Sequence, residues 1–278
     1  NYGLVSKEEM REAGLDAKTA QKLMRMKLKF AFGSIHDTED LLDSLVVGDG
    51  LTTMRNGITI RRTATNVFEF TYSGETVDVD LNLAQNEEYE PPYFLGMHNI
   101  PREYFAVIHA GEGDGWDINR TCMSSILMFH GKIYLIDAGP NILYNLKSLG
   151  IGLNEIEGIF HTHAHDDHFA GLTDIIGADH RIRYFSTPLV RASVMKKLSA
   201  LLSIDESRFH NLFDVHDLAF DEWNDIDGLE VKPRLSPHPV ETNIFFFRAM
   251  WAQGYKTYAH FADIASFAVL EDMLTDNP

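Results

Sequence analysis

Residues 160–172 have the sequence Phe-His-Thr-His-Ala-His-Asp-Asp-His-Phe-Ala-Gly-Leu, a stretch that holds four of the chain's 13 histidines. It follows directly after the apolar run Ile156–Phe160, which predicts a buried strand. A helical pattern begins at Gly171-Leu172, so the histidines are expected on a turn between a strand and a helix. Imidazole nitrogens and carboxylates on one turn are ligands for zinc, iron or manganese. A histidine-rich surface loop is the alternative, and the buried strand before the stretch argues against it.

The spacing within this stretch divides its side chains into two sets. His163 and His165 are two residues apart, so in an extended segment both point the same way and can reach one ion. Asp167 and His168 follow where the chain turns into a helix, and we expect them to face a second ion nearby. His161 is expected to be a core or supporting residue.

Apolar runs on both sides of the histidines predict an α/β domain, because strand-like and helix-like patterns alternate. The expected strands are 105–109, 125–129, 132–136, 156–160, 229–235, 243–248 and 255–262, and the expected helices are 141–149 and 189–202.

The N-terminal third of the chain has a different pattern. The first fifty residues are predicted to be helical, with a capping box at Ser6 and Glu9. Alternating apolar residues around Asn56-Gly57 and around Ser73-Gly74 predict two hairpins. The stretch 85–92, with three glutamates and two prolines, predicts a linker. We therefore expect an accessory segment over residues 1–95 and a second domain over residues 96–278.

The histidine stretch resembles the signature of a known family, and three further motifs of the chain resemble other parts of the same family. Thr162–His168 matches the T-H-x-H-x-D-H signature of the metallo-β-lactamase superfamily. Leu135–Gly139 resembles its first motif, Ser236–Pro239 resembles its third, and Tyr258–Asp263 resembles the strand that ends in its bridging acid. The sequence around these motifs is most similar to the phosphodiesterase and tRNA-processing branch. The resemblance implies a four-layer αβ/βα sandwich, here with an N-terminal helical and β-hairpin appendage.

The resemblance also implies a dinuclear site for two divalent ions, with zinc favoured and iron or manganese as alternatives. Asp137 would hold the metal loop by hydrogen bonds without binding an ion. Asp167 would orient a metal-held hydroxide, the nucleophile of the reaction. The implied ligands are His163, His165 and His238 for the first ion and Asp167 and His168 for the second, with Asp263 between them.

Two features of the sequence depart from the family pattern. Ala262 precedes Asp263 where the family has glycine, which makes His260 a rival ligand on the same strand. The family's last histidine, a ligand of the second ion, is absent, because the 15 residues after Asp263 contain no histidine. Either the chain ends short of its natural C-terminus, or another group replaces this ligand, or the second ion is weakly held.

Composition and charge narrow the class of substrate. With 45% hydrophobic and 23% charged residues the chain is typical of a globular protein, and no apolar run is long enough for a membrane span. The net charge of −17 repels long nucleic acids. The single cysteine, Cys122, excludes an intramolecular disulfide, so a cytoplasmic location is favoured. We expect no membrane partner, and the N-terminal segment is a candidate for mediating a homodimer.

A local basic segment suggests how substrate binds. No acid occurs between His180 and Ile204, whereas Arg181 and Arg183 follow the histidine stretch closely. Either they bind a small phosphate-bearing substrate through their guanidinium groups, or the segment is a solvated basic face.

The sequence thus predicts a metal-dependent hydrolase whose substrate is a small phosphodiester such as a cyclic nucleotide. A carboxylic ester, lactone or thioester is an alternative substrate, since the same metal pair serves acyl transfer. A di-iron redox or oxygen-binding protein is an alternative of another class, although that branch usually has glutamate at the position of His165. A non-catalytic metal-binding module is a third interpretation, prompted by the missing histidine.

Overall fold

The computed structural model describes residues 5–32, 45, 47–87, 89–264, 267–268 and 271. The chain divides into two compact units, one formed by residues 1–35 and 92–278 and the other by residues 36–91. The N-terminal helices therefore group with the large unit and not with the hairpins, which differs from the expected division at residue 95. Residues 47–50 are not helical, and the helix expected over residues 33–44 lies outside the described residues.

Two helices begin the large unit, α1 (Lys7–Glu12) and α2 (Ala17–Phe32). The capping box is confirmed, because the backbone N–H of Glu9 donates to Oγ of Ser6 and the N–H of Ser6 donates to the Glu9 carboxylate. Met10, Ala20 and Leu23 are buried in one cluster with Leu189 of α6 (Pro188–Leu202). This apolar contact explains why both helices belong to the large unit.

The small unit is one antiparallel sheet with the strand order β1-β2-β3-β4. Both predicted hairpins are confirmed, and their turns have positive φ angles, 60° at Asn56 and 76° at Gly57 in the first and 49° at Ser73 and 84° at Gly74 in the second. The elements are β1 (Thr52–Thr53), the 3-10 turn η2 (Arg55–Gly57), β2 (Thr59–Ala64), β3 (Val67–Tyr72) and β4 (Glu75–Asp80).

Six strands form the main sheet of the large unit, in the order β10-β9-β8-β7-β6-β5. The four strands from β7 to β10 are parallel, whereas β5 and β6 are antiparallel additions at one edge. The strands are β5 (Phe105–Gly111), β6 (Ser124–Phe129), β7 (Lys132–Ile136), β8 (Ile156–Phe160), β9 (Arg183–Ser186) and β10 (Asp214–Asp217).

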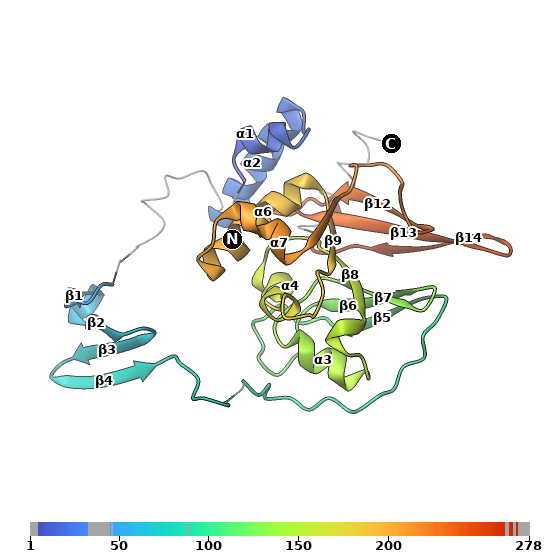
Figure 1. Ribbon diagram of the computed structural model, residues 1–278. Coiled ribbons are helices and arrows are strands. Elements are labelled where there is room, and N and C mark those ends of the chain that lie inside the picture. Colours follow the sequence, from blue (N-terminus) through green and yellow to red (C-terminus); the bar gives the residue numbers. More distant parts are fainter. Residues whose placement is uncertain are drawn as a thin grey trace. The chain divides into compact units, whose positions relative to one another are not determined.

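A second, antiparallel sheet packs face to face with the main sheet (Figure 1). The core between the two sheets is aromatic: the Phe160 ring stacks on Phe185 at 4.8 Å and meets Phe247 edge-on at 5.0 Å. The strands of this sheet are β11 (Asn224–Ile226), β12 (Leu229–Leu235), β13 (Asn243–Trp251) and β14 (Gly254–His260).

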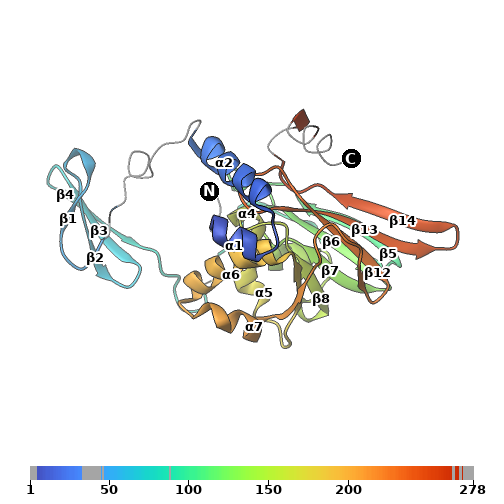
Figure 2. The same cartoon turned by 90° about the horizontal axis from the view of Figure 1, so that it is seen from above.

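Helices cover the other face of the main sheet (Figure 2), where a second apolar core includes Ile126, Leu135 and Ile159. The described residues of the large unit thus form three layers, one of helices and two of sheets. On the sheet β11–β14, Leu235 of β12 packs against the apolar cluster of α1 and α2. A complete fourth layer of helices over this sheet stays a prediction. The helices of this region, besides α6, are α3 (Ile142–Ser148), α4 (Asp166–Phe169), α5 (Leu172–Ile175) and α7 (Phe209–Leu212), with 3-10 turns η3 (Leu153–Glu155) and η4 (Glu206–Arg208).

Candidate metal centre

The histidines lie on a loop, residues 161–168, that begins where β8 ends and continues into α4; we call it the metal loop. Its position is set by both sheets. The N–H of His161 donates to the carbonyl of Phe185 at the end of β9, and the N–H of Asn243 at the start of β13 donates to the carbonyl of Thr162. The loop therefore lies at the edge where the ends of the two sheets meet.

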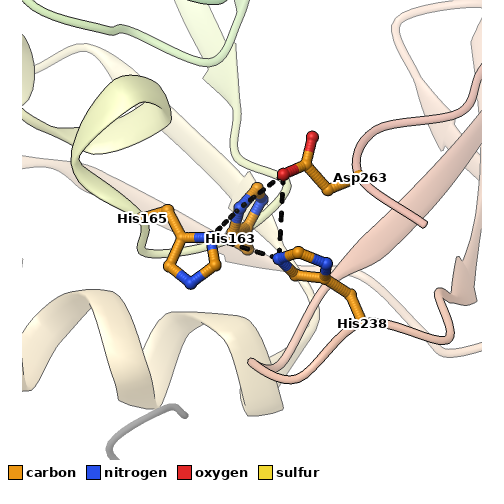
Figure 3. A group of neighbouring side chains, drawn as sticks. All are labelled: His163, His165, His238 and Asp263. Atoms are coloured by element: carbon orange, nitrogen blue, oxygen red, sulfur yellow. Dashed lines mark hydrogen bonds and ion pairs between the residues drawn. The ribbon is translucent and has the colours of Figure 1, made fainter. Parts of the chain in front are cut away.

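Three histidines and one aspartate converge at this edge (Figure 3). Nδ1 of His165 lies 3.0 Å from Nε2 of His163 and 3.1 Å from Nε2 of His238. Oδ2 of Asp263 lies 3.8 Å from Nε2 of His163 and 3.7 Å from Nε2 of His238. Because one ligand atom from each residue lies within 4.8 Å of the others, the four can share one ion.

The other oxygen of Asp263 faces a second group, formed with Asp167 and His168. Nε2 of His168 lies 3.5 Å from Oδ1 of Asp263 and 3.4 Å from Oδ2 of Asp167. The structure thus brings together all six residues that the sequence proposed as ligands, and Asp263 is the member common to both groups.

The donor atoms fit divalent ions. Nε2 of His168 is buried and makes no hydrogen bond within the described part of the chain, although two carboxylates face it. Burial lowers the pKa of His163 well below its usual range and that of His238 to about 4, so both rings are neutral and have a free nitrogen lone pair. Neutral imidazoles and carboxylates are the ligands that zinc, iron and manganese take in proteins.

Asp137 supports the metal loop from below. Its carboxylate is fully buried and accepts hydrogen bonds from the N–H of Thr162 at 2.7 Å, the hydroxyl of Thr162 at 2.6 Å and Nδ1 of His168 at 2.7 Å. Burial alone would raise the pKa of Asp137, but the charge of His168 and its hydrogen bond lower it. Burial likewise disfavours charge on His168, yet the Asp137 carboxylate raises the pKa of that ring to about 10. A ring held in this way keeps Nε2 pointing at Asp167 and Asp263.

Burial also raises the pKa of Asp167 to about 6, and the neighbouring Asp263 carboxylate adds to the shift. A bound cation would reverse this shift, because it favours the carboxylate form.

Lys197 of α6 holds the metal loop from the helix layer, and its spacing in the sequence gave no signal of this. Its Nζ donates to the carbonyl of Ala164 at 2.7 Å and lies 2.6 Å from Oδ1 of Asp166. The same ammonium sits over the ring of Phe169, 4.6 Å from its centroid. One side chain therefore fixes the segment between His163 and His165.

Arg181 and Arg183, which the sequence proposes as substrate-binding residues, pair with other groups of the chain. Arg183 begins β9, at the end of the sheet opposite to the metal loop, and its guanidinium pairs with Asp227 at 2.8 Å. Arg181 donates to the carbonyl of His210. The segment follows the metal loop in sequence, but α4 and α5 carry the chain back across the sheet, because the next strand is parallel.

Two further histidines lie beside the site. His161 is fully buried near Phe169 and Tyr184, where burial lowers its pKa to about 4, as expected of a core residue. His260, the rival ligand, is not a member of either ligand group among the described residues, and its Nδ1 lies 3.1 Å from the hydroxyl of Tyr258.

An α/β sandwich that carries two His/Asp groups with a shared aspartate at the ends of its strands belongs to the class of metallo-β-lactamase-fold metallo-hydrolases. Within that class, the chain belongs to the family described as Anti-Pycsar protein Apyc1, whose model matches residues 105–254. Five of the six grouped residues fall inside the matched region, and Asp263 follows it. The resemblance expected from the sequence is therefore confirmed.

Two curated relatives come from the branches expected from the sequence. The chain is 23% identical to the cGMP-dependent 3',5'-cGMP phosphodiesterase A of Dictyostelium discoideum over 141 residues, which are 51% of this chain and 16% of that protein. It is 33% identical to ribonuclease Z of Mycolicibacterium gilvum over 60 residues, 22% of this chain and 21% of that enzyme. The chain thus spans only about a sixth to a fifth of the length of these relatives.

Two solved structures are also similar to this chain. A diphosphatase of the PhnP family is 19% identical with a TM-score of 0.41, covering 51% of this chain and 61% of its own. Human tRNase Z, short form, is 19% identical with a TM-score of 0.44, covering 58% of this chain and 69% of its own. As to membranes, no helix in the described part of the chain has the length and apolar character needed to span one.

Proposed function

We propose that this chain hydrolyses a small phosphodiester, with cyclic nucleotides as the substrate class, at a centre of two divalent ions. The observation that carries the proposal is the position of Asp263, which presents one oxygen to each of two ligand groups. The match to the Apyc1 family and the similarity to a cyclic nucleotide phosphodiesterase support the substrate class.

In this proposal His163, His165 and His238 would hold one ion and Asp167 and His168 the other, with Asp263 available to both groups. Two divalent ions placed in this way would lower the pKa of a bound water to about 7 and offset the negative charge that develops on the phosphoryl oxygens. Zinc is the proposed metal, with iron and manganese as the alternatives to be tested.

The protein's own residues position the reactants. Oδ2 of Asp167 lies at the second ligand group, and its side chain is only 15% exposed, so it can accept a hydrogen bond from the attacking water and orient it. His168 cannot swing out of its place, because its Nδ1 is held by the buried Asp137. These two side chains thus fix the direction from which water approaches the phosphorus.

Charge favours a small substrate over a long nucleic acid. The chain carries a net charge of −17, and the five basic side chains of residues 181–197 all bind groups of the protein itself. Long polyanions are bound through many released counterions, which requires a basic surface. Hydrolysis of a precursor tRNA, the chemistry suggested by the ribonuclease Z similarity, is therefore the outcome that would overturn the substrate class.

The test is an assay of the full chain, reconstituted in turn with zinc, manganese and iron, with metal content measured on the same sample. The substrates are 3',5'-cyclic purine and pyrimidine nucleotides, a linear phosphodiester, a precursor tRNA, a lactone, a thioester and a β-lactam. We expect two ions per chain, the fastest turnover on a cyclic nucleotide and a weak dependence on salt. Faster hydrolysis of the tRNA, lactone or thioester would refute the substrate class, and two ions without any turnover would favour the redox interpretation.

Variants separate the two ligand groups. His163→Ala should lose the ion of the first group and nearly all activity, whereas Asp167→Ala should keep that ion and lose turnover. His210→Ala, an exposed histidine of α7, is the matched control and should change neither. Normal turnover in Asp167→Ala with a full metal content would contradict the proposed mechanism.

A further inference from the structure

Residues 112–121, which form most of the connection between β5 and β6, lie against the metal loop; we call them the rim loop. A Cβ placed on Gly115 would lie 3.6 Å from Cβ of Asp167. Cys122, directly after the rim loop, packs against Gly139, where an added Cβ would lie 2.8 Å from Cβ of Cys122. Gly139 also contacts the carbonyl group of Asp167. The rim loop therefore borders the second ligand group directly.

The rim loop is held in shape by its own hydrogen bonds. The N–H of Gly113 donates to the carbonyl of Thr121 at 2.7 Å and closes the loop at its base. Arg120 pairs with Glu112 at 2.9 Å, and the N–H of Trp116 donates to the Asp114 carboxylate at 3.2 Å. A loop ordered before binding loses little conformational entropy when a ligand arrives.

Trp116, next to Gly115, presents its side chain to solvent. It is 88% exposed, although tryptophan is highly buried on average. The other two tryptophans have partners: Arg248 lies 3.9 Å from the ring centroid of Trp223, and Lys256 lies 4.7 Å from that of Trp251. Within the described part of the chain the indole of Trp116 has no ring, cation or hydrogen-bond partner.

The charges of the rim loop show which part of a substrate could lie there. The loop has three acids, Glu112, Asp114 and Asp117, and one base, Arg120, which is already paired. Such a loop repels a phosphate group but accepts an uncharged aromatic ring. In a cyclic nucleotide, one sugar separates the phosphate from such a ring, and Trp116 directly follows Gly115, the residue beside Asp167.

We propose that Trp116 is a stacking platform for the nucleobase of the substrate. The inference rests on the proposed function, because the phosphate must occupy the ion site for the base to reach the rim loop. Stacking of a base on an aromatic side chain is tolerant of sequence, since every base has a π face. The platform therefore strengthens binding of all cyclic nucleotides over a cyclic phosphate that has no base.

The test compares Trp116→Ala, Trp116→Phe and Ile118→Ala in the metal-reconstituted full chain. Ile118 is the matched control, because it is a 66% exposed apolar residue of the same loop. The substrates are cyclic GMP and ribose 3',5'-cyclic phosphate, which lacks the base. Trp116→Ala should raise KM for cyclic GMP about tenfold with kcat within about twofold, and leave kcat/KM for the baseless compound unchanged. Trp116→Phe should restore most of the binding.

A second readout is independent of turnover. Titration with a slowly hydrolysed phosphorothioate analogue of cyclic GMP should quench the tryptophan fluorescence of the wild type and of Ile118→Ala, and should quench Trp116→Ala much less. Unchanged KM and unchanged analogue affinity in Trp116→Ala, with normal hydrolysis by the wild type, would overturn the platform alone. If the wild type hydrolyses neither cyclic GMP nor the baseless compound, the proposed function fails and the platform fails with it.

Discussion

Nδ1 of His168 lies 2.7 Å from Oδ2 of Asp137, and both side chains are completely buried. The hydrogen bond fixes the ring so that its other nitrogen, Nε2, faces Asp167 and Asp263. A buried carboxylate behind a metal-binding histidine also makes that imidazole a stronger donor to a cation.

Replacing Asp137 by asparagine keeps the shape of the side chain but removes its charge. We expect Asp137→Asn to bind metal about 10- to 100-fold more weakly, because His168 loses the partner that orients it. Competition with a chelator measures this affinity, and circular dichroism checks that the fold is retained. A folded variant with wild-type metal affinity would show that the hydrogen bond to His168 does not contribute.

Lys197 and its neighbour Lys196 form a matched pair of test positions on α6. Lys197→Met removes the contacts to Ala164 and Asp166, so metal affinity should fall about tenfold. Lys196 pairs instead with Glu9 of α1, so Lys196→Met should lower the stability of the chain and leave metal affinity unchanged. Equal loss of affinity in both variants would contradict a specific role of Lys197 in holding the metal loop.

Gly139 is a position where any side chain collides with the metal loop. A Cβ there would lie 2.2 Å from the carbonyl oxygen of Asp167, so the backbone that carries Asp167 must move. We expect Gly139→Ala to lower the free energy of unfolding by about 2 kcal/mol or more, as overpacking commonly does, and to weaken metal binding. At Gly152 an added Cβ makes only an ordinary contact of 3.5 Å, so Gly152→Ala is the control in urea unfolding.

Glu9 links α1 to α6 in a pH-dependent way. Its hydrogen bond to Lys196 and those to Ser6 lower its pKa from 4.5 to about 2. Because the pKa is lowered in the folded state, the stabilisation is fully present above pH 4.5 and is lost as the pH falls towards 2. The difference in unfolding free energy between wild type and Glu9→Gln should therefore be constant above about pH 5 and shrink below it. A difference that stays constant down to pH 3 would contradict this linkage.

Local patterns were enough to predict most strands of the large unit and both hairpins, although β9, β10 and β11 were not predicted. The runs at 125–129, 132–136 and 156–160 match β6, β7 and β8 within one residue, because buried strands carry continuous apolar sequence. Asn56-Gly57 and Ser73-Gly74 predicted turns because their backbone needs positive φ angles. The grouping of the six proposed ligands followed from the family motifs, which fall at strand ends in this chain.

Long-range placement could not be predicted in the same way. Arg183 is close to the metal loop in sequence, but the return to a parallel strand carries it to the far end of the sheet. Lys197 lies about thirty residues beyond the loop that it holds, and a lysine on a helix gives no sign of the carbonyl it will reach. The helices α1 and α2 group with the large unit through apolar contacts with Leu189, which no local pattern specifies.

The proposed ligands follow strands of two different sheets and lie in distant parts of the chain, His163 after β8 and Asp263 after β14. Neither sheet alone contains a complete first group, so that group can assemble only when both sheets have formed and docked. Contacts between residues as far apart in the sequence as His163 and Asp263 form late in folding. The entropy lost when the long segment between them closes must be offset by contacts already made. High metal affinity should therefore appear as one of the last events of folding, and newly synthesised chains should remain sensitive to proteases until it does.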